Sequence, residues 1–327
     1  MAIAPATVTT GSLASSRPVI FAGHQTFALR SGWLKKGLDA LQDPHIGGAG
    51  FFTRPDALVH LGVGKNMVQS IRYWLAATGV ATESSGTRSR DLEPSSLGKT
   101  LLGDPENEGW DPYLEDPASR WILHWEMATP GGPAYSWCWV FNVLREYEFS
   151  KESLVEGIAK ACASKAAKAP SSETLARDVE CLLHCYVEPA NSKAAEDDLD
   201  CPFRSLGLIQ PCFGRHYRFV VGAKPSLPLE VFVYALTTYW IRRFPQSPTL
   251  SVQDLTYGEG SPGLVFKLDE DSVLAYLDHI AQATADRYRF EDTPLVRQVV
   301  RADLAVMTPL DLLRGYYEVN PGADHVH

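Results

Sequence analysis

The sequence predicts a mainly α-helical protein with small β-hairpins, an α+β class, in which an N-terminal winged helix-turn-helix is followed by helical domains. Apolar residues recur at helical spacing through much of the 327-residue chain. Within the first hundred residues, a helix, a turn, a second helix and a hairpin are expected to follow one another. This is the element order of a winged helix-turn-helix. The length favours two or three packed units.

The first expected helix covers residues 29–41, where Leu34, Leu38 and Leu41 recur at helical spacing. A glycine-rich break over residues 47–50 ends this segment. A short β-prone stretch at residues 19–21 precedes it. These features predict one amphipathic helix at the start of the folded part of the chain.

The helix-turn-helix is expected directly after this break. Residues 55–61 predict a short helix with proline at its start. Residues 62–64 form a glycine-rich turn, residues 65–78 a second helix, and Gly79 a C-terminal stop. The strands expected to complete the unit are 80–84 and 90–92.

The rest of the chain divides by composition. Residues 118–145 are rich in aromatic side chains and predict buried helices with a break at 130–133, and residues 189–200 form an acidic loop. The expected domains are a flexible arm (1–18), a DNA-contacting winged helix-turn-helix (19–110), a helical, aromatic-rich domain (111–200) and a C-terminal α+β domain (201–327).

Charge is unevenly distributed along the chain. The net charge is −9, but residues 1–100 hold 10 Lys and Arg against 6 Asp and Glu, and the remainder holds 20 against 33. Basic charge is therefore concentrated where the helix-turn-helix is expected, which favours DNA as a partner. No segment approaches the roughly 20 apolar residues that span a bilayer, so no membrane partner is expected. Without a recognisable signal peptide, we expect a cytoplasmic location with all six cysteines reduced.

The second helix supplies the main candidates for DNA contact. Lys65 and Asn66 stand at its N-terminus, where free backbone amides favour phosphate. Gln69, Arg72 and Tyr73 lie off its apolar stripe, and Gln and Arg suit base edges in a major groove. The alternatives are a solvated helix face or a protein-binding surface. The further candidates for DNA contact are Lys35, Lys36, Arg88 and Arg90.

A polar run boxed by aromatic residues, Phe21 to Phe27, supplies the catalytic candidates. His24 is expected as a general base or phosphate ligand, because its pKa lies near working pH. Gln25 and Arg30 are expected near the reacting phosphate, where Arg30 with Lys35 would neutralise charge. The alternative is a histidine that serves the fold.

Three groups of potential metal ligands favour a structural interpretation. Asp111, Glu115 and Asp116, with His124 and Glu126, are interrupted by prolines typical of turns and helix caps. The acidic run Asp269 to Asp271 is likewise more typical of turns and helix caps than of a metal site. Reduced thiols are also favoured over a zinc site, because the spacing lacks paired short Cys motifs. The cysteines and histidines considered as zinc ligands are Cys181, His184, Cys185, Cys201, Cys212 and His216. No nucleotide or redox cofactor is expected, since the glycine-rich binding motifs are absent.

Several blocks of the sequence resemble a known family. They are residues 21–27 with Arg30 and 33–36, residues 61–68 with 70–74, residues 111–117 with Trp121 and 124–125, and more weakly 199–202 and 261–270. They are similar to the SspB-like family of bacterial DNA phosphorothioation systems, a former family of unknown function, and the likeness covers residues 19–317.

The resemblance implies a reaction and partners. Members of this family occur with a cysteine desulfurase, an ATPase and an ATP pyrophosphatase, and a nick would open one DNA strand for sulfur to replace a phosphate oxygen. The leading expectation is thus a DNA nicking endonuclease of a phage-defence system, with a divalent metal (Mg or Mn) as possible cofactor and an unknown metal site. The alternatives are a non-enzymatic DNA-binding specificity subunit that recruits sulfur-transfer partners, and a scaffold that binds protein. A homodimer would suit a palindromic site.

Overall fold

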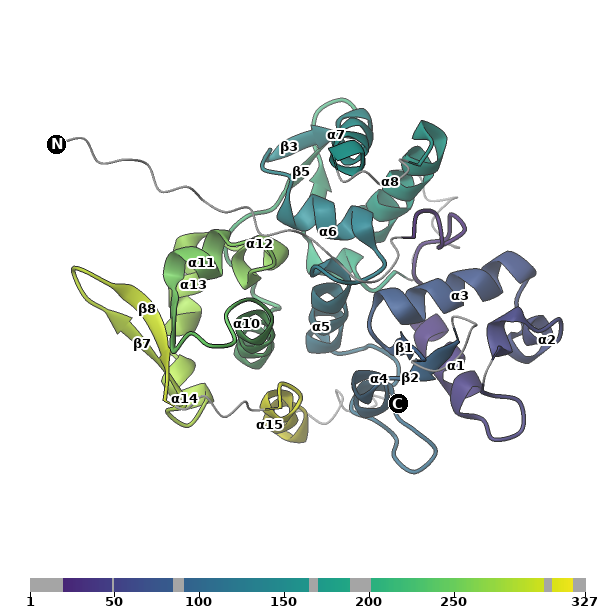
Figure 1. Ribbon diagram of the computed structural model, residues 1–327, viewed down its shortest axis with the longest axis horizontal. Coiled ribbons are helices and arrows are strands. Elements are labelled where there is room, and N and C mark those ends of the chain that lie inside the picture. The colour runs from purple at the N-terminus through teal and green to yellow at the C-terminus, as the bar shows by residue number, and fades with distance from the viewer. Residues whose placement is uncertain are drawn as a thin grey trace.

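The computed structural model describes residues 20–48, 50–84, 91–164, 170–188, 201–302 and 308–319. Over these residues the protein is mixed α+β and mostly helical, with one two-stranded and two three-stranded antiparallel sheets. The predicted α+β class is confirmed at this level. Figure 1 shows the elements α1 to α4 at one end of the molecule and the β7–β8 hairpin at the other.

The N-terminal elements follow the predicted order. Helix α1 buries Leu34, Leu38 and Leu41, the leucines that predicted it. Gly62 and Gly79 take left-handed φ angles of 62° and 72° where α2 and α3 end, a conformation that glycine adopts without steric cost. The elements are α1 (Ser31–Gln42), η1 (Phe51–Thr53), α2 (Ala57–Leu61), α3 (Lys65–Ala77), β1 (Ala81–Glu83), β2 (Leu92–Pro94) and α4 (Ser96–Leu102).

The hairpin after α3 is antiparallel, with Ala81 paired to Pro94 and Glu83 to Leu92. Its connecting residues 85–90, which include the candidates Arg88 and Arg90, lie outside the described residues. The helix, turn, helix and hairpin are therefore present in order. That this unit is a winged helix-turn-helix stays a prediction.

The aromatic-rich segment forms the centre of the core. Trp121, Trp125 and Trp137 are fully buried, and the chain breaks between α5 and α6 where the prolines and glycines predicted it. The elements are α5 (Pro117–Ala128), α6 (Tyr135–Asn142), β3 (Glu148–Ser150), α7 (Lys151–Ser164) and α8 (Ser172–Tyr186).

The C-terminal elements are built around α10, which packs on α5, α14 and α15. Strand β5 pairs with both β4 and β3, so a strand from before residue 200 shares a sheet with two from after it. The expected domain boundaries stay a prediction. The elements are η2 (Arg204–Leu206), β4 (Ile209–Pro211), β5 (His216–Phe219), α10 (Leu229–Arg243), β6 (Thr249–Ser251), α11 (Val252–Tyr257), α12 (Pro262–Phe266), α13 (Glu270–Leu277), α14 (Ile280–Ala283), β7 (Tyr288–Asp292), β8 (Arg297–Arg301) and α15 (Asp311–Val319).

The last described helix ties the end of the chain back to its first half. The Tyr317 hydroxyl hydrogen-bonds the Ser119 hydroxyl at 2.9 Å, and its ring stacks on Trp110 with centroids 4.8 Å apart. Among the described ranges, no helix is both long enough and apolar enough to cross a membrane.

A buried lysine lies where α12 ends. Lys267 takes a left-handed φ of 56°, its ammonium donates to the Phe141 carbonyl at 2.9 Å, and it lies 4.0 Å from the Phe219 ring centroid. Burial lowers the pKa of Lys267 to about 7, because the charged form loses its hydration.

This shift predicts a pH dependence of stability. Above pH 7 the folded protein loses the Lys267 proton, whereas the unfolded chain keeps it up to a pKa of about 10.4. The unfolded state then binds more protons, so the contribution of Lys267 to the free energy of unfolding rises with pH, by up to about 1.4 kcal/mol per pH unit.

Urea unfolding between pH 6 and pH 9 tests this dependence. The free energy of unfolding should rise less steeply above pH 7 in the Lys267→Met variant than in the wild type, while Lys160→Met, at an exposed position on α7, should keep the wild-type slope. Lys224, whose pKa burial lowers to about 8, is present in all three proteins and cancels in the comparison. Parallel curves for the wild type and Lys267→Met would contradict the assignment.

Candidate functional site

The loop that precedes α1 has an unusual backbone. Ala22, Gln25 and Thr26 take left-handed φ angles of 53°, 50° and 68°, although none of them is glycine. Backbone bonds from Gln25 N to Ala22 O (3.1 Å) and from Phe27 N to His24 O (2.9 Å) close two consecutive turns. Such conformations persist only where surrounding contacts hold them, and they cluster at functional sites.

A buried polar cluster holds this loop in place. Asp178, on α8, accepts hydrogen bonds from Ala22 N at 2.7 Å and from His24 Nε2 at 2.9 Å, and the Ser136 hydroxyl donates to its other oxygen. His24, Ser136 and Asp178 are each no more than 1% exposed. The cluster thus joins the loop to α8, through contacts between residues more than 150 positions apart, and Asp178 in turn links the loop to Ser136 on α6.

The contacts of His24 define its state. Thr26 N donates to Nδ1 at 3.1 Å, so the ring proton lies on Nε2 and is donated to Asp178. The rings of Tyr73, Trp74 and Trp137 surround the imidazole. Both nitrogens are engaged and the side chain is fully buried, so His24 positions the loop. This differs from the expected contact with a phosphate, because the expectation did not include the carboxylate on α8.

A pocket of about 240 Å³ opens beside the strained loop. It lies between the loop, α3 and the β1–β2 hairpin, and four residues that the sequence singled out line it: Gln25, Gln69, Arg72 and Tyr73. Its other lining residues are Ile20, Gly23, Ala76, Ala81, Thr82, Glu83, Leu92 and Pro133. The structure therefore brings one candidate for catalysis and three for DNA contact to a single pocket.

Tyr73 corrects one expectation. The side chain is 4% exposed and packs against His24, whereas the sequence placed it on the open face of the helix. Burial raises the pKa of Tyr73 well above its usual value. The apolar side of α3 is wider than the spacing of its apolar residues indicates, because the loop around His24 packs against a second side of the helix.

The remaining basic candidates lie around this region. Lys65 and Asn66 are exposed at the start of α3, and Lys36 is exposed on α1. Lys35 forms an ion pair with Asp39, and the Arg30 guanidinium lies 5.3 Å from the Trp33 ring centroid. Arg30 is thus partly engaged by the fold and is not among the residues that line the pocket.

Sequence reasoning missed Asp178, Ser136, Thr82 and Glu83. One signal was available for Asp178, which stands in the apolar stripe that Leu175 and Val179 form on α8. A carboxylate in such a stripe is rarely buried without a partner. Thr82 and Glu83 carried no comparable signal, since they look like any residues of a short hairpin.

The acidic cluster serves the fold, as the sequence favoured. Asp111 accepts from the backbone nitrogens of Glu115 and Asp116 at 2.9 and 3.0 Å, and Asp116 caps α5. Buried His124 is held by the Tyr186 hydroxyl at 2.7 Å and the Val265 carbonyl at 3.0 Å. Burial lowers the pKa of His124 to about 3, so this ring is neutral at physiological pH.

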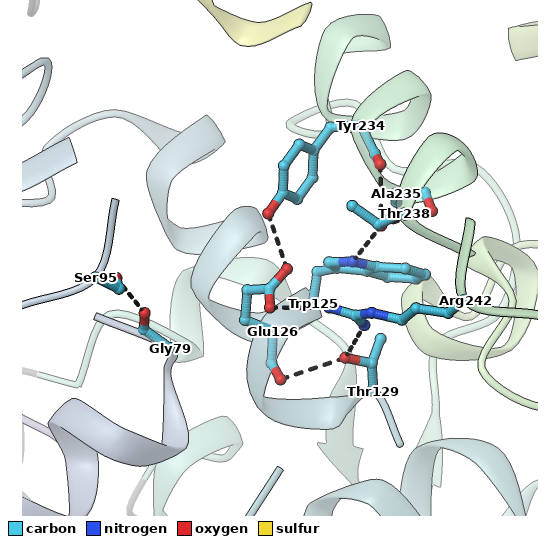
Figure 2. A network of polar contacts seen from close by, with 9 residues as sticks. All are labelled: Gly79, Ser95, Trp125, Glu126, Thr129, Tyr234, Ala235, Thr238 and Arg242. Carbon is cyan, nitrogen blue, oxygen red and sulfur yellow. Dashed lines mark hydrogen bonds and ion pairs between the residues drawn. The ribbon is translucent and has the colours of Figure 1, made fainter. Parts of the chain in front are cut away.

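Glu126 fastens α5 to α10 (Figure 2). Its carboxylate accepts from the Tyr234 hydroxyl at 2.8 Å and from Arg242 at 3.2 Å, and Arg242 also donates to the Thr129 hydroxyl at 2.8 Å. Through these hydrogen bonds Glu126 links helix α5 to helix α10.

The cysteines are free thiols, and those at 138, 162, 181, 185 and 201 are buried. Within the described ranges, no three His, Cys, Asp or Glu side chains are grouped so that they could hold a metal ion. No residues of this part of the chain are assigned to a metal centre, and no chemical step is routed through one.

Comparisons with known proteins agree on one family. A family model described as "Protein of unknown function (DUF4007)" matches residues 21–317. A magnesium ion-bound SspB crystal structure is similar to this chain, with 30% sequence identity and a TM-score of 0.82, over 93% of this chain and 90% of that chain. A second SspB crystal structure shares 31% identity with a TM-score of 0.81 over the same fractions. No match was found among curated proteins.

Proposed function

This chain belongs to the DUF4007 family and is SspB-like, and from that premise we propose that it is the DNA-nicking component of a bacterial phosphorothioate modification system. The family resemblance supplies the pathway. The main observation in support is the pocket. It lies where the loop of residues 22–27, held in left-handed conformations by the Asp178 cluster, meets the polar side of α3.

The arrangement around α3 supports contact with DNA. Lys65 and Asn66 are exposed where the helix begins, and Gly64 provides no side-chain cap, so the first backbone amides point outward. Such a helix start favours phosphate oxygens. Gln69 and Arg72 lie further along the same helix and reach the pocket. A DNA strand whose phosphate is bound at Lys65 would therefore have its adjacent nucleotides close to the pocket.

The different burial of His24 and Gln25 indicates different roles for the two residues. His24 is enclosed and bonded to Asp178, so it acts through the loop that it fixes. Gln25 is exposed and lines the pocket from that loop. We assign to Gln25 a contact with DNA next to the cleaved phosphate, and to His24 and Asp178 the positioning of that contact.

Conversion of supercoiled plasmid to open circles tests the nicking proposal. The purified protein is assayed with Mg²⁺, with Mn²⁺ and with EDTA, beside a Gln25→Gly variant. Glycine tolerates the left-handed φ at this position, so the variant removes the side chain without straining the loop. We expect Gln25→Gly to lower the nicking rate roughly tenfold or more, as loss of a well-placed polar contact does.

Thr26→Gly is the matched control. Thr26 is exposed, lies in the same loop with a left-handed φ, and its hydroxyl donates to the neighbouring Gln25 carbonyl. Nicking should survive this change. Equal rates for the two variants would remove Gln25 from the site, and a wild type that binds DNA without nicking it would favour the specificity subunit instead.

A further inference from the structure

The charges of the described residues that line the pocket are balanced. Arg72 contributes one positive charge and Glu83 one negative charge, and the neutral polar side chains among these residues are Gln25, Gln69, Tyr73 and Thr82. A phosphate group in the pocket would be attracted by the guanidinium of Arg72 but repelled by the carboxylate of Glu83. The charges therefore favour a neutral ligand that has both hydrogen-bond donors and acceptors.

The polar groups reach the pocket from three separate elements. Gln25 comes from the loop, Gln69 and Arg72 from α3, and Glu83 from β1. The amide nitrogen of Gln69 donates to the Phe52 carbonyl at 3.0 Å, so its remaining hydrogen-bonding capacity lies mainly on its oxygen. The pocket thus offers acceptors at Gln69 and Glu83 and donors at Arg72 and Gln25, the side-chain types that read the edges of bases.

The other walls are apolar and rigid. Ile20, Ala76, Leu92 and Pro133 line the pocket with the ring of Tyr73. A Cβ atom at Gly23 would meet the Tyr73 ring at 2.5 Å and the Ile20 side chain at 2.8 Å, so glycine allows the loop to close on these residues. A preformed pocket with apolar walls and a few convergent polar groups binds a flat ligand with little reorganisation.

We propose that this pocket takes a single nucleobase that has left the DNA stack. The proposal rests on the proposed function, because DNA held at the start of α3 brings bases beside the pocket. The volume of about 240 Å³ is below the roughly 300 Å³ of the smallest drug-sized pockets, which suits one base better than a larger cofactor. Tyr73 and Pro133 would flank the base, and Gln25, Gln69, Arg72 and Glu83 would bond its edge.

Ala76→Phe tests the pocket without changing its charge. Ala76 lines the pocket on α3, so a phenyl ring at this position fills the space meant for the base. Ala163→Phe makes the same substitution at an exposed site on α7 and serves as the matched control. Thermal unfolding of both variants shows that they are folded.

Binding is measured by fluorescence anisotropy with two duplexes that differ only by one central mismatch. Unstacking a mismatched base costs less, so the wild type and Ala163→Phe should bind the mismatched duplex roughly tenfold tighter than the matched one. Ala76→Phe should bind both duplexes equally. With 2-aminopurine placed at successive positions, the wild type should raise the fluorescence at one position severalfold, and Ala76→Phe should not.

The outcomes separate this proposal from the proposed function. Salt-sensitive binding of DNA without a mismatch preference and without a 2-aminopurine signal would overturn the base pocket alone. A preference that Ala76→Phe retains would also overturn it. Absence of any DNA binding would overturn both proposals. Free 2-aminopurine riboside is the final arm, and its binding to the wild type but not to Ala76→Phe, without any signal from DNA, would assign the pocket to a free nucleoside and overturn an extruded base.

Discussion

Replacing Asp178 with alanine is expected to lower the free energy of unfolding by about 3 to 5 kcal/mol, because three donors share this acceptor and a buried donor left unsatisfied costs about 1 to 3 kcal/mol. The carboxylate is 1% exposed and accepts from Ala22 N, His24 and Ser136. Without it, three donors in the core lose their acceptor, and each keeps its desolvation cost. Urea unfolding of the purified protein measures the change.

The surface pair of Lys35 and Asp39 provides the comparison. Asp39 is half exposed, so Asp39→Ala should cost less than about 1 kcal/mol. If Asp178→Ala were no more destabilising than Asp39→Ala, the cluster would not be what holds the strained loop. A large loss would instead identify His24 and Asp178 as the support on which the shape of the pocket depends.

Reversing the charge of Lys65 and Arg72 together is expected to weaken DNA binding roughly a hundredfold near physiological salt, and to reduce the salt slope of the affinity by about 1 to 2. Lys65 is exposed at the start of α3, where it would contact phosphate, and Arg72 lines the pocket on the same helix. The variant is Lys65→Glu with Arg72→Glu, and anisotropy titrations at several salt concentrations give both quantities.

The matched control reverses two charges elsewhere. Lys160 and Arg177 are both more than half exposed, on α7 and α8, and each pairs with a glutamate of its own helix. Lys160→Glu with Arg177→Glu changes the net charge equally, so its affinity should fall only slightly through the overall field. Equal losses for the two double variants would show that DNA contact is not localised at α3.

The two pairs of variants examine different properties of one region. The Asp178 comparison reports on the scaffold beneath the pocket, and the charge reversals report on the surface beside it. Asp178→Ala could lower the stability strongly while the reversal of Lys65 and Arg72 leaves DNA affinity unchanged. The loop would then still be held by the buried cluster, but the ligand of the pocket would be something other than duplex DNA.

The sequence by itself predicted the helices α1, α2 and α3 and their order along the chain. Helical spacing of leucines predicted α1, and Gly62 and Gly79 marked the ends of α2 and α3, because glycine alone adopts a left-handed φ without cost. The roles of Asp111 in a turn and of Asp116 as a helix cap could also be predicted from the sequence, since their hydrogen bonds join residues only a few positions apart. Lys65 and Asn66 are exposed at the start of α3, the helix terminus at which the sequence placed them.

Only the tertiary structure decided what these residues do together. His24 meets a carboxylate 154 positions away on α8, and no local pattern encodes which element covers a given side chain. Tyr73 was expected on an open face and is buried, because periodicity reveals the main apolar stripe of a helix but not a second face that a loop covers. The pocket depends on this same packing, since it brings Gln25, Arg72 and Glu83 together from three elements whose relative positions are fixed by the core and not by their own sequences.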